Sequence, residues 1–363
     1  MDNTISLTSR IQAFIKLSEL LKRISATLDG NNGLKPNGAA EKAICVAGRE
    51  AEKTNPWFTQ REIARALNAI SVMTSEKALL KWAKKYPGMQ DQSSGQKTVA
   101  VIMAGNIPLV GFHDFLCVLI AGHRFLGKLS SQDAQLPVAL ADLLLDIEPG
   151  LKSQVAFTKE LAWEADAIIA TGSDNTARYF EYHFGNKPHI IRKNRNSVAV
   201  LTGEETEEEL QMLGEDIFAY YGLGCRSVSH LFVPEDLNLH CLAEAWKPFK
   251  YLLLNKKYKN NLDYNKALSE VSGTSFSHAG HCIFAHNPAL ASPLSVIHYT
   301  PYKSITEAEK FIQIHATGIQ CVVSDNKLET NAVPVVSFGQ SQQPELDDYA
   351  DGVDTMQFLL SLD

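Results

Sequence analysis

Short β-rich runs that alternate with helix-forming segments restrict the fold of this sequence more than any other feature. KTVAVIMAG (97–105), HRFLGKLS (123–130) and ADAIIATGS (165–173) are such runs, and the last leads directly into a segment with helical spacing. Parallel strands need crossover connections, which are usually helices, so this alternation favours a parallel sheet. The sequence therefore predicts an α/β fold.

The same alternation continues to the end of the chain. An acidic segment, 203–216, predicts a helix start, because carboxylates are stabilising at a helix N-terminus. Two further segments, 241–254 and 305–316, have helical spacing. Strands are predicted in VAVLTG (198–203), SVSHLFVP, CIFAH, PLSVIHY, IQCVVSD and AVPVVSFG.

The first part of the chain reads as helices instead. Thr59 is a candidate N-cap ahead of Glu62, and helical spacing continues from residue 58 to 86. Residues 87–96 then form a loop of turn formers and small polar residues. Apolar residues also recur at helical spacing near the start of the chain, at Ile11, Phe14, Leu17, Leu20 and Leu21.

A chain of 363 residues is longer than one hydrophobic core usually supports, so two lobes are expected. We place the helical segment and a first Rossmann-like parallel-sheet domain in residues 1–202. A second Rossmann-like domain with a C-terminal extension then occupies residues 203–363.

Charge and composition exclude several classes of protein. The formal net charge of −7 gives no reason to expect nucleic acid or an anionic membrane as a partner. No apolar run is long enough to span a membrane, and the start lacks the plan of a signal peptide. The six cysteines have no paired spacing, so we expect free thiols in a cytoplasmic protein.

Cys225 lies at a break between a helical segment and a strand, in the stretch YYGLGCRSVSHLFVP (220–234). Gly222 and Gly224 allow a sharp turn that would expose the cysteine, and Arg226 would favour its thiolate. A nucleophile is one interpretation and a buried structural cysteine is the other. The other cysteines lie in apolar contexts and are assigned to the core: Cys45, Cys117, Cys241, Cys282 and Cys321.

Polar residues follow two of the predicted strands in the first lobe. Asn106 comes after the strand that ends in Gly105, and an amide there could hold a developing oxyanion. It could equally be a turn residue bonded to its own backbone. Gly172 and Ser173 follow another strand and precede a helix, which suits an anion such as phosphate. An N-cap at Ser173 or Asp174 is the alternative.

Several cations are candidates for phosphate or ribose contacts. Lys128 ends a predicted strand and could bind either group, or remain solvated. The run RKNRNS (192–197) places Arg192, Lys193 and Arg195 within four residues, either as a solvated turn or as a phosphate site. HAGHC (278–282) lacks the partner ligands of a metal site, so no metal is expected.

The order of these motifs resembles that of the aldehyde dehydrogenase superfamily. That family has an N-x-P asparagine, a K-P-[SA] lysine, an F-T-G-S helix start and then a nucleophilic cysteine, in that order. GNIP, GKLS, ATGS and GLGC follow the same order here, and the likeness runs from about residue 95 to the C-terminus. RKNRNSVAVL and GLGCRSVSHLFVP more closely resemble the long-chain acyl-CoA reductase (LuxC) branch.

The resemblance implies a role for each matching residue. Cys225 would be the nucleophile, and Asn106 with the backbone N–H of Cys225 would form the oxyanion hole. Lys128 would contact the adenosine ribose or its phosphate, and Gly172 and Ser173 would lie at the pyrophosphate. The implied fold is aldehyde dehydrogenase-like, and the family likeness also implies a homo-oligomer.

Departures from the family pattern refine this hypothesis. The family's water-activating glutamate is replaced by about Arg192, which disfavours hydrolysis of a thioacyl intermediate. The family's E-I-F-G-P segment corresponds to about ALASPLSV, which has no carboxylate to hold the nicotinamide ribose. NAD-preferring members often carry a glutamate three residues after the lysine. This chain has Ser131 there, which favours NADPH.

The hypothesis is therefore an NADPH-dependent reductase of a long-chain acyl-CoA that yields an aldehyde. Arg192, Lys193 and Arg195 are assigned to the CoA phosphates on charge alone. The LuxC branch includes the reductase component of bacterial bioluminescence fatty-acid reductases. That likeness allows an acylated partner ligase to replace CoA as the acyl donor. Two alternatives remain open: an oxidative aldehyde dehydrogenase, and a non-catalytic member that binds acyl-CoA or nucleotide.

Overall fold

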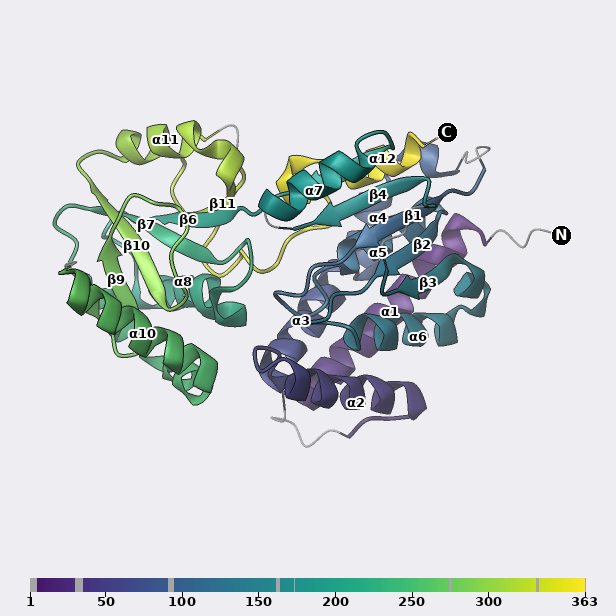
Figure 1. Ribbon diagram of the computed structural model, residues 1–363, viewed down its shortest axis with the longest axis horizontal. Coiled ribbons are helices and arrows are strands. Elements are labelled where there is room, and N and C mark those ends of the chain that lie inside the picture. The colour runs from purple at the N-terminus through teal and green to yellow at the C-terminus, as the bar shows by residue number, and fades with distance from the viewer. Residues whose placement is uncertain are drawn as a thin grey trace. The chain divides into compact units, whose positions relative to one another are not determined.

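The computed structural model divides the chain into two compact units, each built on its own sheet (Figure 1). Unit 1 comprises the residues up to Lys193 and those from Gln343 onward, and unit 2 comprises Asn194–Gln342. The structure describes residues 5–29, 35–90, 95–160, 164–172, 174–273, 276–330 and 333–362.

Unit 1 is built on a parallel sheet with strand order β3-β2-β1-β4-β5. Its central strand is β1, which pairs with β2 on one side and with β4 on the other. This order confirms the parallel α/β prediction for the first lobe. The strands are β1 (Thr98–Ile102), β2 (Arg124–Lys128), β3 (Val155–Thr158), β4 (Ala167–Thr171) and β5 (His189–Arg192).

Helices cover both faces of this sheet. Successive strand residues point to opposite sides, so each strand contributes side chains to two separate cores. Val99 and Val101 of β1 face a large core that contains helices from the N-terminal segment. Ala100 and Ile102 face Phe180 of α7 instead. The helices of unit 1 are α1 (Leu7–Leu28), α2 (Ala39–Thr54), α3 (Gln60–Met73), α4 (Glu76–Ala83), α5 (Phe112–Ala121), α6 (Leu136–Ile147), α7 (Asp174–Phe184) and α12 (Thr355–Leu360).

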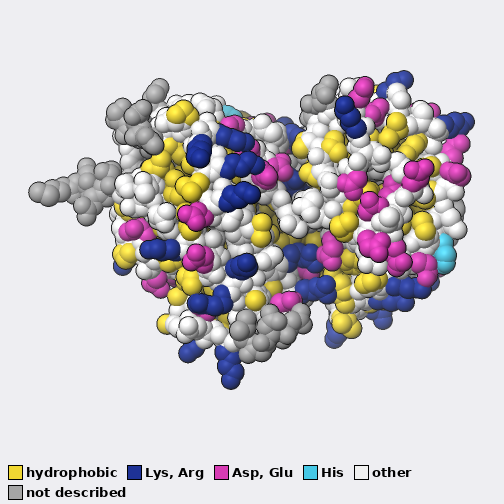
Figure 2. Space-filling model, turned by 180° about the vertical axis from the view of Figure 1, so that it is seen from behind, with side chains coloured by type: hydrophobic (Ala, Val, Ile, Leu, Met, Phe, Trp, Pro, Cys, Tyr) yellow, Lys and Arg dark blue, Asp and Glu magenta, His cyan; other side chains and the backbone are white. Residues whose placement is uncertain are grey.

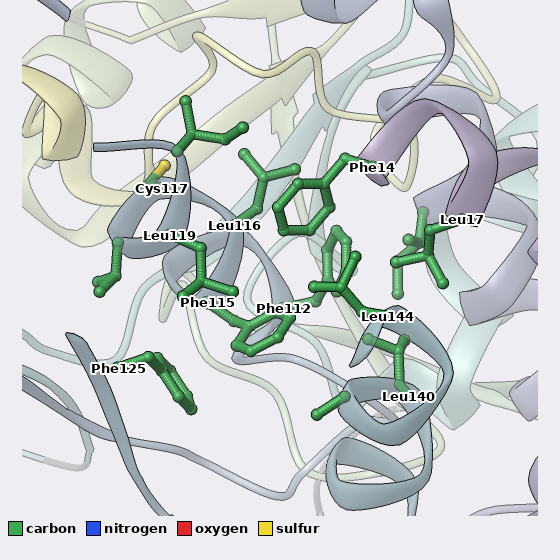
Figure 3. Close-up of a cluster of buried hydrophobic side chains, with 14 of the residues drawn as sticks. Phe14, Leu17, Phe112, Phe115, Leu116, Cys117, Leu119, Phe125, Leu140 and Leu144 are labelled. Carbon is green, nitrogen blue, oxygen red and sulfur yellow. The ribbon is translucent and has the colours of Figure 1, made fainter. Parts of the chain in front are cut away.

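The predicted N-terminal helices form part of the core of unit 1. Figure 3 shows Phe14 and Leu17 of α1 beside side chains of α5 and α6. The Phe14 ring packs edge-on against Phe112 and Phe115, with centroids 6.3 and 6.2 Å apart. Thr59 caps α3 as expected, since its side chain accepts a hydrogen bond from the Glu62 N–H. The helical segment is therefore required to bury one face of the sheet.

Unit 2 is built on a second sheet, with strand order β12-β11-β6-β7-β10-β9-β8. Its described pairs are parallel except β8–β9, which is antiparallel. The strands are β6 (Asn196–Val200), β7 (Val228–Pro234), β8 (Phe276–His278), β9 (Ile283–His286), β10 (Val296–Tyr302), β11 (Ile319–Val323) and β12 (Val335–Val336). The helices are α8 (Glu207–Phe218), α9 (His240–Ala245), α10 (Lys256–Ser272) and α11 (Ile305–Ile314).

Local sequence signals explain the helix boundaries of unit 2. Thr206 and Glu209 form a capping box, which starts α8 within the acidic segment as predicted. The single helix expected over 241–254 is divided in two instead. Pro248 cannot donate a backbone hydrogen bond, so α9 ends at Ala245 and a 3₁₀ segment, Lys247–Leu254, follows.

The boundary between the units differs from the predicted one at 202/203. VAVLTG, which we assigned to the first lobe, contains β6, and β6 pairs with β7 and β11 in the sheet of unit 2. The residues from Gln343 onward belong to unit 1 and not to the predicted second lobe. Tyr349 is fixed there by hydrogen bonds with Trp82 and Tyr86, at 2.9 and 2.6 Å.

Figure 2 shows basic and acidic side chains interspersed on one face of the molecule. Within the described part of the chain, no helix has both the length and the apolar composition needed to cross a bilayer.

Candidate active site

Three candidate residues lie where neighbouring strands of unit 1 end. β1 is paired so that Ile102 lies opposite Lys128 of β2 and Ala170 of β4. Because the strands are parallel, the segments that follow them leave the same edge of the sheet. The structure thus brings the Asn106 loop, Lys128 and Gly172 to one edge. This is the edge at which ligands bind in open α/β sheets.

The loops after β1 and β2 touch one another. A Cβ atom placed on Gly105 would lie 2.4 Å from Ser130 Oγ, so only glycine fits this approach. Asn106 and Ser131 are exposed, and Lys128 is half-buried. The side chains assigned to the oxyanion and to the nucleotide are therefore carried on loops in direct contact.

Gly172 allows a close approach between β4 and α7. A Cβ atom on it would lie 2.9 Å from the Thr176 side chain, and its N–H donates to the Arg192 carbonyl at 3.2 Å. That N–H is already used within the sheet. The prediction for Ser173 lies outside the described residues.

Asp133 is a residue at this edge that the sequence reasoning missed. It is 3% exposed, and its Oδ2 accepts a hydrogen bond from the Leu109 N–H at 2.7 Å. Leu109 has a φ of 59°, a left-handed conformation that is unfavourable for leucine. Asp133 therefore holds the loop that carries Asn106. The only signal in the sequence is an acidic residue just before an apolar helix.

Burial raises the pKa of Asp133 to about 7, although the hydrogen bond from Leu109 opposes this shift. The folded chain thus keeps a proton between about pH 4 and pH 7 that the unfolded chain releases. The free energy of unfolding should therefore fall as the pH rises through this window. Asp133→Asn keeps an acceptor for Leu109 and should make this fall smaller. Urea unfolding at pH 5 and pH 7.5 tests it, and equal falls in both proteins would contradict it.

The cations of the RKNRNS segment are separated by the structure. Arg192 ends β5 and is 6% exposed, with Nη1 and Nη2 bonded to the two Asp114 oxygens at 2.6 and 2.9 Å. Its Nη2 also donates to Thr355 Oγ1 at 2.9 Å. Because this charge is buried and compensated by Asp114, the geometry does not favour the predicted contact of Arg192 with a CoA phosphate.

Lys193 and Arg195 have different surroundings from Arg192. Lys193 is exposed and forms an ion pair with Glu181 at 3.3 Å. Arg195 is half-buried in unit 2, and its Nη1 donates to the Ile319 carbonyl at 3.3 Å. The chain passes from unit 1 to unit 2 between Lys193 and Asn194, so the two cations belong to different units.

Cys225 lies on a strained turn in unit 2. After α8 ends at Phe218, Tyr220, Tyr221 and Gly222 have φ values of 53°, 58° and 77°. Consecutive left-handed conformations cost about 1–2 kcal/mol for each non-glycine residue. Both tyrosine side chains are buried, which offsets this strain.

The turn presents Cys225 half-buried, neither in the core nor fully exposed. Its carbonyl accepts a hydrogen bond from Ser197 Oγ of β6 at 3.0 Å, which ties the turn to the sheet. Arg226 Nε donates to the Ser341 carbonyl. A role of Arg226 in favouring the Cys225 thiolate stays a prediction.

The other cysteines differ from Cys225 in exposure. Burial raises the pKa values of the Cys117 and Cys282 thiols, which makes both poor nucleophiles. Cys45 and Cys321 are also buried, but Cys241 is exposed and not in the core as expected. Within the described ranges, no three His, Cys, Asp or Glu side chains gather as metal ligands would.

Comparison with known proteins identifies the family. A family model described as acyl-CoA reductase (LuxC) matches residues 2–246, about two thirds of the chain. The chain belongs to the acyl-CoA reductase (LuxC) family. The match includes Asn106, Lys128 and Cys225. No curated protein matches the sequence.

Solved structures show that this LuxC family member has the aldehyde dehydrogenase fold. Aldehyde dehydrogenase 21 from Physcomitrella patens, in complex with succinate, superimposes with a TM-score of 0.61 at 13% identity over 97% of this chain and 87% of that one. An NADP-dependent enzyme from E. coli gives 0.61 at 12% identity, over 92% and 82%. The NAD⁺ complex of an aldehyde dehydrogenase from Bacillus cereus gives 0.57 at 13% identity, over 91% and 80%.

Family and fold together make this LuxC family member an oxidoreductase of the acyl-CoA reductase and aldehyde dehydrogenase type. The aldehyde dehydrogenase-like fold with two Rossmann-like sheets is confirmed. The long-chain substrate, NADPH and the residue roles remain predictions.

Proposed function

We propose that this protein reduces a long-chain acyl-CoA to the corresponding aldehyde with NADPH, through a thioacyl intermediate on Cys225. The half-buried cysteine on its strained turn, within the segment that matches the LuxC family, carries this proposal. A turn fixed by buried side chains holds the sulfur in a constant place, which suits a nucleophile.

The reaction divides into two halves. The Cys225 thiolate attacks the thioester carbon, the bond to the CoA sulfur breaks, and CoA leaves as a thiolate that takes up a proton. Asn106 and the backbone N–H of Cys225 stabilise the oxyanion, in the roles that the family likeness assigns. The thioacyl group is then reduced, and the resulting thiohemiacetal collapses to aldehyde as Cys225 leaves as a thiolate.

A nicotinamide cofactor, when bound, supplies the hydride for the second half. The edge of sheet β3-β2-β1-β4-β5 fits the nucleotide in its chemistry. Lys128 ends β2 as a cation, and Ser131 offers a hydroxyl in place of a carboxylate that would repel a 2′-phosphate. These two residues support NADPH over NADH. Gly172 and Ser173 remain our proposed residues for the pyrophosphate.

The buried Arg192 also favours reduction over hydrolysis. A guanidinium cannot act as a general base, and its Nη atoms are engaged by Asp114. A base that activates water is therefore not supplied at the position where the wider family has its glutamate. We propose that Lys193 and Arg195 contact the CoA phosphates, and that the protein forms a homo-oligomer.

NADPH consumption with acyl-CoAs from short to long chain tests the function. We expect turnover with long chains, free thiol release equal to NADPH consumed, and slower turnover with NADH. Reduction of NADP⁺ by aldehyde without CoA would favour an oxidative dehydrogenase instead. Binding of NADPH without turnover of any thioester would favour an acylated partner ligase as donor, or a non-catalytic protein.

A further inference from the structure

Asp216 is a buried carboxylate that the proposed reaction does not use. It lies in α8, and its side chain is completely buried. Its Oδ2 accepts a hydrogen bond from the Gly339 N–H at 2.6 Å, and its Oδ1 accepts one from the Ser341 N–H at 2.9 Å. One side chain thus fixes two backbone groups of the segment at 337–342.

The segment at 337–342 contacts the turn that carries Cys225. The Ser341 carbonyl accepts a hydrogen bond from Nε of Arg226, the residue that follows the cysteine. A Cβ atom on Gly224 would lie 3.9 Å from Gln342 Oε1, on the other side of Cys225. Asp216 is therefore connected to both neighbours of Cys225 through residues 341 and 342.

We infer that Asp216 is a positioning residue, which fixes the Ser341 carbonyl and through it Arg226, the residue that follows Cys225. The inference rests on the proposed role of Cys225 as nucleophile. Arg226 follows Cys225 directly in the chain, so fixing Arg226 should fix the turn and with it the reactivity of the sulfur.

The two hydrogen bonds require a carboxylate at this position. Asparagine has one acceptor oxygen, and its NH₂ group would face a backbone N–H, so one of the two bonds is lost. Burial raises the pKa of Asp216 to about 6 against the lowering effect of these bonds, and the neighbouring Glu215 raises it further. Glu215 on the same helix acts electrostatically on this carboxyl group, and Arg226 is reached through Ser341. Glu207, Glu208 and Glu209 lie in the first turn of the same helix.

The rate of Cys225 alkylation by iodoacetamide tests the inference in the full-length protein. Mass spectrometry of the modified peptides follows Cys225, with the exposed Cys241 as an internal reference. We expect Asp216→Asn to slow the alkylation of Cys225 about tenfold, which corresponds to the loss of one charge-assisted hydrogen bond. The alkylation rate of Cys241 should not change. Asp236→Asn, an exposed aspartate of the same unit, is the matched control.

A double-mutant cycle separates positioning from a general structural role. If Asp216 acts through Arg226, then Asp216→Asn should slow alkylation no further in an Arg226→Ala background. The inference would be overturned if the rate losses of Asp216→Asn and Arg226→Ala multiply in the double variant. Equal alkylation rates in Asp216→Asn and Asp236→Asn would also overturn it. The assay needs neither acyl-CoA nor NADPH. Its result can therefore be interpreted even if the protein does not catalyse the proposed reaction.

A measurement on the parent protein covers the case in which Asp216→Asn does not fold. As the pH falls from 7 to 5, protonation of Asp216 should lower the alkylation rate of Cys225 relative to that of Cys241 by about tenfold. A constant ratio of the two rates over this range would overturn the inference.

Discussion

Replacing Cys225 by serine is expected to lower acyl-CoA reduction by at least about 10³-fold. The hydroxyl of serine is far less acidic than a thiol and is a weak nucleophile at neutral pH, so the acyl transfer should fail. The second half of the reaction should fail with it, because no thioacyl group forms. Steady-state NADPH consumption with a long-chain acyl-CoA measures the loss.

A control variant and an acylation measurement complete the test of Cys225. Cys241→Ser removes an exposed thiol of the same unit and should leave turnover unchanged. Incubation of the parent with acyl-CoA and without NADPH should add one acyl group to the Cys225 peptide. If the Cys225→Ser protein binds NADPH and still reduces acyl-CoA at the parent rate, then Cys225 is not the nucleophile.

Replacing Arg192 by methionine is expected to lower the free energy of unfolding by about 3–5 kcal/mol. Arg192 and Asp114 are 6% and 5% exposed and joined by two hydrogen bonds. Methionine would leave the Asp114 carboxylate buried without its cation, which is far more costly than losing the pair as a whole. Urea unfolding followed by circular dichroism measures the change.

The adjacent lysine provides a matched control. Lys193 also forms an ion pair, with Glu181, but both side chains are about half exposed. Exposed pairs contribute at most about 1 kcal/mol, so Lys193→Met should change stability little. In Arg192→Met, a second change of Asp114 to leucine should recover much of the loss. Equal stability of the two single variants would show that the Arg192–Asp114 pair is not effectively buried.

Local signals in the sequence determined the elements of this protein. Short β-rich runs that alternate with helix-forming segments predicted β1, β2, β4 and β6. Thr59 and Thr206 set helix starts through hydrogen bonds that span only three residues. The order of the motifs, from Asn106 to Cys225, then indicated the family. Each of these signals depends on residues near one another in the chain, and for that reason sequence alone could carry them.

Long-range contacts decided the rest. The strand β6 belongs to unit 2 because it pairs with β7 and β11, although nothing in its composition marks a boundary before it. Arg192 lies in a charged run that indicates a solvated turn, yet Asp114, 78 residues earlier, makes its burial possible. Asp216 meets the 339–341 backbone across more than 120 residues. The energy of a buried charge depends on partners that only the folded chain brings near, so these positions could be understood from the tertiary structure alone.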